Sequence, residues 1–344
     1  MAAQIARRLL SGILLLFALT LVTFVIYYEI PADPGKALCP DCTASEIKAI
    51  DHRLGVDESV LVQYGNFIWR IVRHGDLGQG FNSGSVNATV RAAAPITLSL
   101  VVGGALVLLL LSFPLALLSA LKAQTVVDRA VLMFSILGIA LHPFVVGAIL
   151  RGFFNGDLHV LPHGQYCPLF GTHELVPEYK IGEPYPAGPP PTCGGLADWS
   201  KHLLLPWLTF ACFFLPLYVR MIRARLLETL GEQYVVTARA KGASELRILR
   251  RHVLKNALLP ITTMLAMDMG TALTAAIYVE TVFGLPGLGL SAIAAISGAN
   301  GPFDLPVILA IVFVVATTIV VLTLLVDLAY GFLDPRIRLR REPA

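Results

Sequence analysis

Three ionisable side chains stand out because they interrupt apolar stretches of this 344-residue sequence. Asp268 lies in the middle of one stretch, Glu280 near its end beside a Gly/Pro turn, and His142 directly before Pro143 in another. A carboxylate at the centre of a membrane span costs roughly 2.5–3.5 kcal/mol, so Asp268 is expected to face a bundle interior or an aqueous path. It can bind a cationic group or hydrogen-bond a neighbouring helix, and the sequence does not decide between these roles.

Glu280 and His142 each have a functional and a structural interpretation. Glu280 can gate the outer mouth of a pathway or contact a substrate amine, but acceptance of backbone amides from the following loop is favoured. His142 can be a ligand or a protonation switch, but packing or hydrogen bonding is favoured for a single histidine in a span. Together with Asp268 they are the candidates for a pathway or gate.

Four cysteines, Cys39, Cys42, Cys167 and Cys193, lie in two polar segments, whereas Cys212 lies in an apolar stretch. Four cysteines on an oxidising side of a membrane suggest two disulfides with three possible connectivities. Cys39–Cys42 with Cys167–Cys193 is the simplest. The C-x-x-C spacing is also found in metal and redox sites, but no second ligand pair has matching spacing, so no metal site is predicted.

The sequence contains none of the usual catalytic motifs. There is no G-x-x-x-x-G-K-[ST] phosphate loop, and neither H-E-x-x-H nor G-x-S-x-G is present. The chain is therefore not expected to be an enzyme or to carry a cofactor, and any energy source must be on other chains.

The composition predicts which elements position these residues. The chain is 56% hydrophobic and only 14% charged, with a mean hydropathy of +0.72, whereas a soluble domain carries about 25% charged residues. We therefore expect an all-α membrane protein. Six stretches are long enough to cross about 30 Å of hydrocarbon, approximately 9–30, 96–121, 130–150, 203–219, 257–279 and 306–332. The first is expected to be a retained helix, because it is longer than a signal peptide core and no small-x-small cleavage site follows it.

Basic residues predict the orientation of the chain. Segment 220–255 holds nine basic and three acidic residues, whereas 31–94 holds six and seven, and 153–202 two and five. Because Lys and Arg concentrate on the cytoplasmic side, both termini and the segment around 230–255 are expected to lie in the cytoplasm. An even number of spans agrees with this orientation.

The chain accordingly divides into four parts. They are a tail with the first span (1–30), an extracytoplasmic segment (31–94), a transmembrane domain (95–335) and a basic cytoplasmic tail (336–344). The transmembrane domain includes an irregular, Pro- and Gly-rich outer loop (153–202) and a cytoplasmic loop (220–256). Helical apolar spacing occurs in the extracytoplasmic segment at Ser45–Leu54 and Val60–Val72, and part of that segment is expected along the membrane surface. Good helix formers on both sides of Gly242 predict two short helices in the cytoplasmic loop.

The cytoplasmic loop resembles a known motif. The run Glu232–Gly242, followed by Arg251–Pro260, is similar to the EAA loop of dipeptide- and oligopeptide-type ABC importer permeases. Val236 stands where the general pattern has its Glu, as it commonly does in the peptide branch. Further similarity lies, in order, at Leu54-Gly55, Gln63-Tyr64, Gly75–Gly78, Pro95–Leu98, Val279–Phe283, Pro286–Gly289, Asp327–Tyr330 and Leu333–Arg336. The loop 153–202, His142-Pro143 and Asp268 depart from the family pattern and leave the substrate open.

The resemblance implies the type I ABC importer fold with six spans, and a coupling helix that sits in a groove of a cytoplasmic ATPase subunit. The coupling candidates are Tyr234, Thr237, Ala238, Arg239, Ala240, Lys241, Gly242 and Ala243. Small residues permit close approach, and Arg239 and Lys241 can pair with acidic groups of a partner. The alternative for this stretch is a solvated basic loop that only obeys the charge rule for membrane orientation.

The resemblance also implies the partners and the location. They are a second homologous permease, two ATPase subunits that bind ATP and Mg, an extracytoplasmic substrate-binding protein and the lipid bilayer, with no nucleic acid. The expected location is the bacterial cytoplasmic membrane. The chain would form half of a pathway for di- and oligopeptides, and related permeases carry nickel complexes, glutathione or oligosaccharides. A proton-coupled secondary transporter is remote, because inverted repeats and paired buried carboxylates are not apparent. A membrane enzyme would need a paired nucleophile and base.

Overall fold

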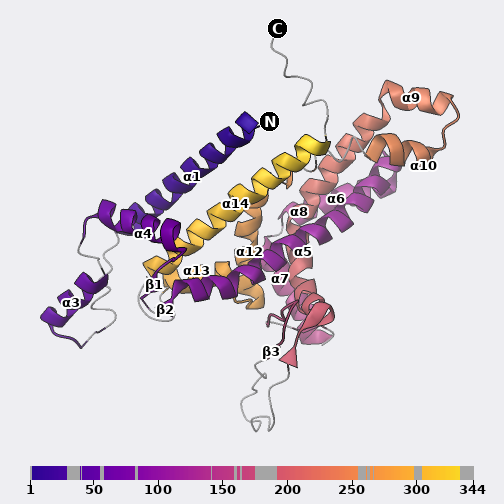
Figure 1. Ribbon diagram of the computed structural model, residues 1–344. Helices are drawn as coiled ribbons and strands as arrows, with labels where there is room; N and C mark the ends of the chain where they lie inside the picture. The colour runs from indigo at the N-terminus through magenta and orange to yellow at the C-terminus, as the bar shows by residue number, and fades with distance from the viewer. Residues whose placement is uncertain are drawn as a thin grey trace. The chain divides into compact units, whose positions relative to one another are not determined.

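The computed structural model describes residues 2–28, 39, 41–54, 58–81, 84–140, 142–158, 161–162, 165–174, 192–254, 261, 264–265, 267–297 and 304–333. The described residues are mostly helical (Figure 1). They fall into two compact units, the first formed by residues 1–95 and 286–325 and the second by residues 96–285 and 326–344.

The first unit is built from helices at both ends of the chain. Its elements are α1 (Ala2–Tyr28), α3 (Ala44–Leu54), α4 (Val60–His74), β1 (Gln79–Gly80), β2 (Gly84–Ser85), the start of α5 (Val86–Leu121), α13 (Leu288–Ser297) and most of α14 (Leu305–Leu333). The helices predicted at Ser45–Leu54 and Val60–Val72 are confirmed as α3 and α4. Strands β1 and β2 form a short antiparallel hairpin that leads into α5.

Two apolar clusters hold the first unit together. In one, the start of α5 packs on α13 and α14 through residues such as Val90, Leu288 and Ile311. In the other, Phe24 of α1, Phe67 of α4 and Leu309 of α14 pack together and are almost completely buried. Helix α4 is therefore fixed against two long apolar helices.

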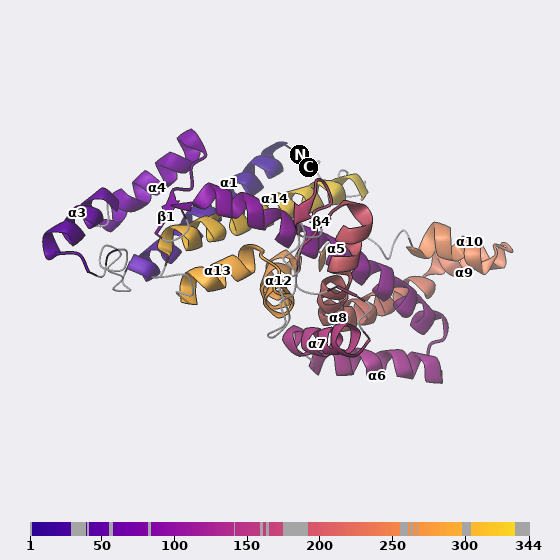
Figure 2. The same cartoon turned by 90° about the horizontal axis from the view of Figure 1, so that it is seen from below.

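The second unit surrounds helix α8. Its elements are the rest of α5, α6 (Val126–Ala140), α7 (Pro143–Arg151), the π-helical turn η1 (Gly152–Asp157), β3 (His173–Glu174), β4 (Thr192–Cys193), α8 (Gly195–Leu230), α9 (Gln233–Ala240), α10 (Glu245–Ile248), the π-helical turn η2 (Leu249–Val253) and α12 (Met269–Phe283). Figure 2 shows α6 and α7 beside α8, in agreement with their contacts.

Glycines let neighbouring helices approach α8 closely. A methyl group at Gly103 of α5 would overlap the ring of Trp207, and one at Gly104 would lie 2.5 Å from Phe210. The Trp207 indole N–H also donates to the carbonyl oxygen of Ser99 at 3.0 Å. Gly138 of α6 meets Pro216 in the same way, with 2.7 Å to a hypothetical methyl group. Small residues at helix contacts are the usual means of close packing where lipid supplies no hydrophobic driving force.

Several boundaries differ from the sequence prediction. Within the described residues, four helices are long and apolar enough to cross a membrane, and the number rises to six if two sharply bent helix pairs each count as one span. The predicted span 130–150 is one of these pairs, because the chain bends where α6 ends and α7 begins at Pro143. A proline at the first helical position starts a new helix readily but cannot continue the preceding one.

The ends of both predicted loops are helical. The outer loop 153–202 ends earlier than predicted, since α8 begins at Gly195. The loop predicted at 220–256 begins later than predicted, because α8 continues through Leu230. Helix α12 covers the second half of the predicted span 257–279 and continues past its end to Phe283. Residues 255–260 and the tail 336–344, on which other predictions fall, lie outside the described residues.

The glycine contacts around α8 lead to a prediction. Gly103→Ala should lower the free energy of unfolding by about 1–3 kcal/mol, because the added methyl group cannot fit against the Trp207 ring without displacing it. Gly270→Ala is the matched control, since a methyl group there meets nothing within 4 Å. Thermal unfolding of the purified chain in detergent measures both. An equal unfolding temperature for the two variants would contradict the close contact between α5 and α8.

Candidate coupling segment and buried polar groups

The coupling segment, residues 233–253, follows α8 directly. Gly231 ends α8, and α9 starts two residues later at Gln233. The two short helices predicted here are confirmed as α9 and α10, and Figure 1 shows them beyond the end of α8. Gly242 joins them with a φ of +78°, a left-handed conformation that favours glycine. Its N–H donates to Arg239, and the Ala243 N–H donates to Ala238.

One side of the coupling segment is anchored in the core of the second unit. Val235, Ile248 and Val253 are completely buried in the same apolar cluster as Ile222 and Leu226 of α8. The candidates Ala238 and Ala243 are partly buried against this cluster. The coupling segment is therefore a packed extension of α8 and not a loose polar loop.

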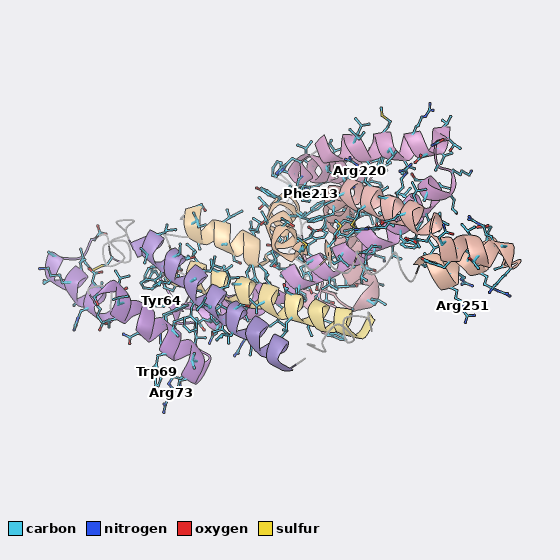
Figure 3. All side chains as sticks on the ribbon, turned by 90° about the horizontal axis from the view of Figure 1, so that it is seen from above. Tyr64, Trp69, Arg73, Phe213, Arg220 and Arg251 are labelled. Carbon is cyan, nitrogen blue, oxygen red and sulfur yellow. A yellow bond between two sulfur atoms is a disulfide. The ribbon has the colours of Figure 1, made fainter. Side chains whose placement is uncertain are left out.

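The other side of the coupling segment is exposed. It presents the apolar residues Val236 and Leu246 next to charged ones. Figure 3 shows Arg251 pointing away from the ribbon here. The exposed coupling candidates are Tyr234, Thr237, Arg239, Ala240, Lys241 and Gly242. Apolar side chains among basic ones suit a protein partner better than bulk water does, because an exposed apolar patch commonly marks an interaction site.

An ion pair closes the turn at Gly242. The Arg239 guanidinium donates to both carboxylate oxygens of Glu245, at 2.7 and 3.1 Å. This hydrogen bond and the nearby positive charge hold the pKa of Glu245 below its ordinary value. Arg239 was predicted to pair with an acidic group of a partner, whereas in the structure it pairs within the segment.

A second, buried ion pair joins α8 to the start of α6. Asp128 is only 3% exposed, and Arg223 donates to both of its carboxylate oxygens at 2.7 Å. The Ser119 hydroxyl donates to the same carboxylate at 2.5 Å, and the Gln124 N–H at 2.8 Å. Because one carboxylate accepts from three elements, it fixes the end of α8 nearest the coupling segment.

Sequence reasoning missed this pair, which we call the Asp128–Arg223 clasp. The available signal was a lone carboxylate in the first turn of an apolar helix, a position that favours a negative charge. Arg223 was counted only as one of many basic residues. No sequence spacing links the two residues, since they are 95 positions apart.

Asp268 is half-buried and accepts a hydrogen bond from the Tyr218 hydroxyl of α8 at 2.9 Å. Glu280 is completely buried, and its carboxylate accepts from the Thr97 hydroxyl of α5 at 2.6 Å. The amides of the loop after α12 reach the backbone carbonyl of Glu280, which accepts from Gly284 and Leu285. Both carboxylates therefore connect α12 to a neighbouring helix.

His142 has a mainly local role in the structure. Its Nδ1 accepts from the N–H of Phe144 at the start of α7, and its ring packs edge-on against Tyr278 at a centroid distance of 4.6 Å. Tyr278, which His142 contacts, is two residues from Glu280. Asp268 lies about 18 Å from Glu280 along the helix, at 1.5 Å per residue. The three pathway candidates thus do not form one cluster.

The cysteines follow the simplest predicted connectivity. Cys39 is joined to Cys42, and Cys167 to Cys193, while Cys212 is a free thiol. The second disulfide lies on the β3–β4 hairpin, in which His173 pairs with Cys193, directly before α8. Among the described residues, no group of three or more His, Cys, Asp or Glu is placed to hold a metal ion.

Comparison with known families matches nearly the whole chain. Residues 112–339 match the family described as "Binding-protein-dependent transport system inner membrane component". Residues 1–101 match the corresponding N-terminal family, "Binding-prot-dependent transport system membrane comp, N-term". The two matches follow each other in the order expected for one protein.

Similar proteins agree with this assignment. The chain is 33% identical to the probable D,D-dipeptide transport system permease protein DdpB of Escherichia coli, covering 97% of each chain. It is 32% identical to the dipeptide transport system permease protein DppB of the same species, covering 97% of this chain and 98% of that protein. A putative peptide permease of Brucella suis is 31% identical, over 96% and 98%.

One solved structure is also similar, the inward-facing MetNI methionine ABC transporter. The likeness covers 78% of this chain and 98% of that chain, with a TM-score of 0.48 and 14% identity. The family models and the permease relatives are sufficient without it. The chain belongs to the family of inner membrane components of binding-protein-dependent transport systems.

Proposed function

We propose that this chain is the membrane-spanning permease subunit of an ATP-driven importer and forms half of a pathway for di- and oligopeptides. The observation that carries the proposal is the coupling segment, which is packed on the end of α8 by buried residues and leaves an apolar and basic face uncovered. The peptide substrate is supported by the names of the relatives, which include dipeptide permeases.

The proposed partners are the proteins that would supply the other half of the pathway, the ATP hydrolysis and the substrate. Two cytoplasmic ATPase subunits would bind ATP and Mg, and one would receive the exposed face of the coupling segment. A second homologous permease would supply the other half of the pathway, and an extracytoplasmic binding protein would deliver the substrate. The chain itself would bind no nucleotide, so its contribution is mechanical.

The proposed topology has six spans with both termini in the cytoplasm. Four of the spans would be α1, α5, α8 and α14. The bent pair α6–α7 would be the fifth, and the segment containing α12 would be the sixth. The disulfides support this orientation, since both would then lie on the oxidising outer side. The basic coupling segment would then lie inside, where Lys and Arg concentrate.

The proposed mechanism uses α8 as a lever. Movement of the ATPases would push the coupling segment, and its buried anchors would pass the displacement to α8. The clasp would carry the same displacement to α5 and α6, because Asp128 accepts from groups on α8 and on the α5–α6 turn. The Tyr218–Asp268 and Thr97–Glu280 hydrogen bonds would link α12 to α8 and α5 respectively. Alternating access would follow from the joint motion of these helices.

The turn at Gly242 provides the test of the coupling role. Gly242→Val should abolish co-purification of the ATPase subunits, because a β-branched residue is strongly disfavoured at a φ of +78°. Gly231→Ala is the matched control, since its φ of −84° suits any residue and a methyl group there makes only ordinary contacts. If both variants retain the ATPase subunits and peptide uptake, the coupling assignment is wrong.

The clasp should be intolerant of a charge exchange. Arg223→Gln should cost about 3 kcal/mol of stability, because it leaves the Asp128 carboxylate buried without its charged partner. The exchange Asp128→Arg with Arg223→Asp should not restore stability, since the Gln124 N–H, which can only donate, would then face a cation. Thermal unfolding and the ratio of ATP hydrolysed to peptide transported measure the effect. Full recovery in the exchanged variant would show that the clasp is a simple charge pair.

The Arg239–Glu245 pair should make the turn at Gly242 sensitive to pH. Its contribution is fully present above 4.5, the ordinary pKa of Glu, and is lost as the pH falls through the lower pKa of the folded protein. The protection of the amides at 242–248 against hydrogen exchange, taken relative to the intrinsic rate at each pH, should therefore fall only below pH 4.5. Glu245→Gln should show the faster exchange already at neutral pH, and Lys241→Gln is the control. Equal protection in Glu245→Gln and the native chain would show that the Arg239–Glu245 pair does not stabilise the turn at Gly242.

A further inference from the structure

Helix α4 carries more apolar surface than the core of the first unit covers. Phe67 is buried, and Tyr64, Ile68 and Ile71 are partly buried on the same cluster. A second set of apolar side chains remains exposed. Leu61 is 75% exposed, Val62 48%, Trp69 59% and Val72 74%. We call these four residues the outer strip.

The outer strip is continuous with the core side of α4. At about 100° per residue, the core-facing residues span roughly 240–340° when Leu61 is placed at 0°, and the outer strip spans roughly 0–100°. Polar residues, including Gln63, Asn66 and Arg70, occupy the remaining third. A helix packed only on protein needs an apolar face of little more than 100°. The additional apolar sector of α4 thus requires another apolar environment.

Contacts with α1 indicate the depth at which α4 lies. The Tyr64 hydroxyl is 2.9 Å from the Thr20 hydroxyl and donates to the carbonyl oxygen of Phe17 at 3.0 Å. The apolar span of α1 ends at Ile26. Thr20 lies six residues earlier, which corresponds to about 9 Å at 1.5 Å per residue. The Tyr64 hydroxyl therefore lies inside the span and not above it.

Contacts with α14 give a similar depth independently. Phe67 packs in one buried cluster with Leu309, and the apolar span of α14 begins at Leu305. Four residues of helix correspond to about 6 Å. Both values fall within the roughly 5–10 Å at which interfacial helices bury their apolar face at the headgroup and acyl boundary.

The end of α1 also presents apolar side chains outside the core of the first unit. Val22, Val25 and Ile26 are each about half exposed. Helix α3, in contrast, distributes Glu46, Lys48 and Asp51 around its circumference and has no such strip. An exposed apolar strip is therefore a feature of α4 and not of the whole segment 31–94.

Trp69 and Arg73 occupy the boundary between the outer strip and the polar third. The Arg73 guanidinium lies 5.4 Å from the centre of a Trp69 ring, and Figure 3 shows both side chains pointing outward from α4. Tryptophan is enriched at membrane interfaces, and arginine extends its charged end from apolar surroundings to the headgroups. This pair therefore places an indole at the acyl boundary with a cation at headgroup level.

We propose that α4 is an interfacial helix of the outer leaflet, with the outer strip in the acyl boundary and Arg73 on a phospholipid phosphate. The proposal rests on the proposed topology only for the choice of leaflet. A lipid occupant is favoured over a protein because α4 contacts α1 and α14 at a depth inside their apolar spans. The helix would fix the height of α1 and α14 in the bilayer.

Nitroxide accessibility tests the depth of α4. The full chain with Cys212→Ser is labelled at Leu61→Cys, Val72→Cys or the polar-side control Asn66→Cys, in nanodiscs containing phosphatidylglycerol and phosphatidylcholine. Labels at 61 and 72 should collide several-fold more with oxygen than with a water-soluble nickel chelate, and the label at 66 should show the reverse. Thermal unfolding establishes that each labelled chain is folded.

Two other outcomes would overturn the proposal. Strong nickel collision at 61 and 72 would place the outer strip in water. Exclusion of both probes from these positions would mean that protein covers the strip. Neither outcome depends on transport, so failure here is distinguishable from failure of the importer assignment.

The role of Arg73 needs a separate measurement. Native mass spectrometry of the chain released from the same nanodiscs should retain phosphatidylglycerol on the native protein and on Arg73→Lys. Retention should fall several-fold on Arg73→Gln, because a neutral amide cannot pair with the phosphate. Equal retention on all three chains would exclude Arg73 as the headgroup ligand.

Discussion

Close packing of helices on α8 is the constraint on which the second unit depends. Apolar side chains gain little by leaving lipid for a protein interior of the same polarity, so burial alone cannot hold the helices together. Contacts without gaps must do so instead, and the Gly103–Trp207, Gly104–Phe210 and Gly138–Pro216 contacts provide them. Any motion that transports a substrate has to preserve these contacts or exchange them as complete sets, because a packed interface does not deform continuously.

The polar contacts of the second unit restrict how the packed helices can move relative to one another. The clasp, the Tyr218–Asp268 bond and the Thr97–Glu280 bond each connect two helices through a carboxylate, which is buried at Asp128 and Glu280 and half-buried at Asp268. Such groups are costly to separate in a low-dielectric interior, since the separated carboxylate would lose its donors. They therefore favour rotation of helices about the bonded points over independent sliding. Two of the three involve α8, which is the helix that continues into the coupling segment.

Sequence information predicted those parts that depend on local pattern. Long apolar runs revealed α1, α5, α8 and α14, and Gly242 revealed the turn between α9 and α10, since a left-handed residue is a local requirement. Pro143 was visible in the sequence, but the stretch 130–150 was predicted as one span without a bend being assigned to it. The clasp was not predictable, because Asp128 and Arg223 meet only through the tertiary packing of α6 on α8. The pathway candidates were identified as unusual residues, but the distance between Asp268 and Glu280 along α12 required the helix itself.

The length of α8 gives a physical reason for combining these features in one helix. Its 36 residues correspond to about 54 Å, well beyond the roughly 30 Å of hydrocarbon. It starts two residues after the Cys167–Cys193 disulfide and ends where the coupling segment begins. Pro206 and Pro216 interrupt its backbone hydrogen bonds, and the second is held by contact with Gly138 of α6. A helix weakened at two internal points transmits force only if neighbours support those points. The packing of α5, α6 and α7 around α8 supplies that support, so the interrupted helix meets the requirement of the proposed lever mechanism from the disulfide to the coupling segment.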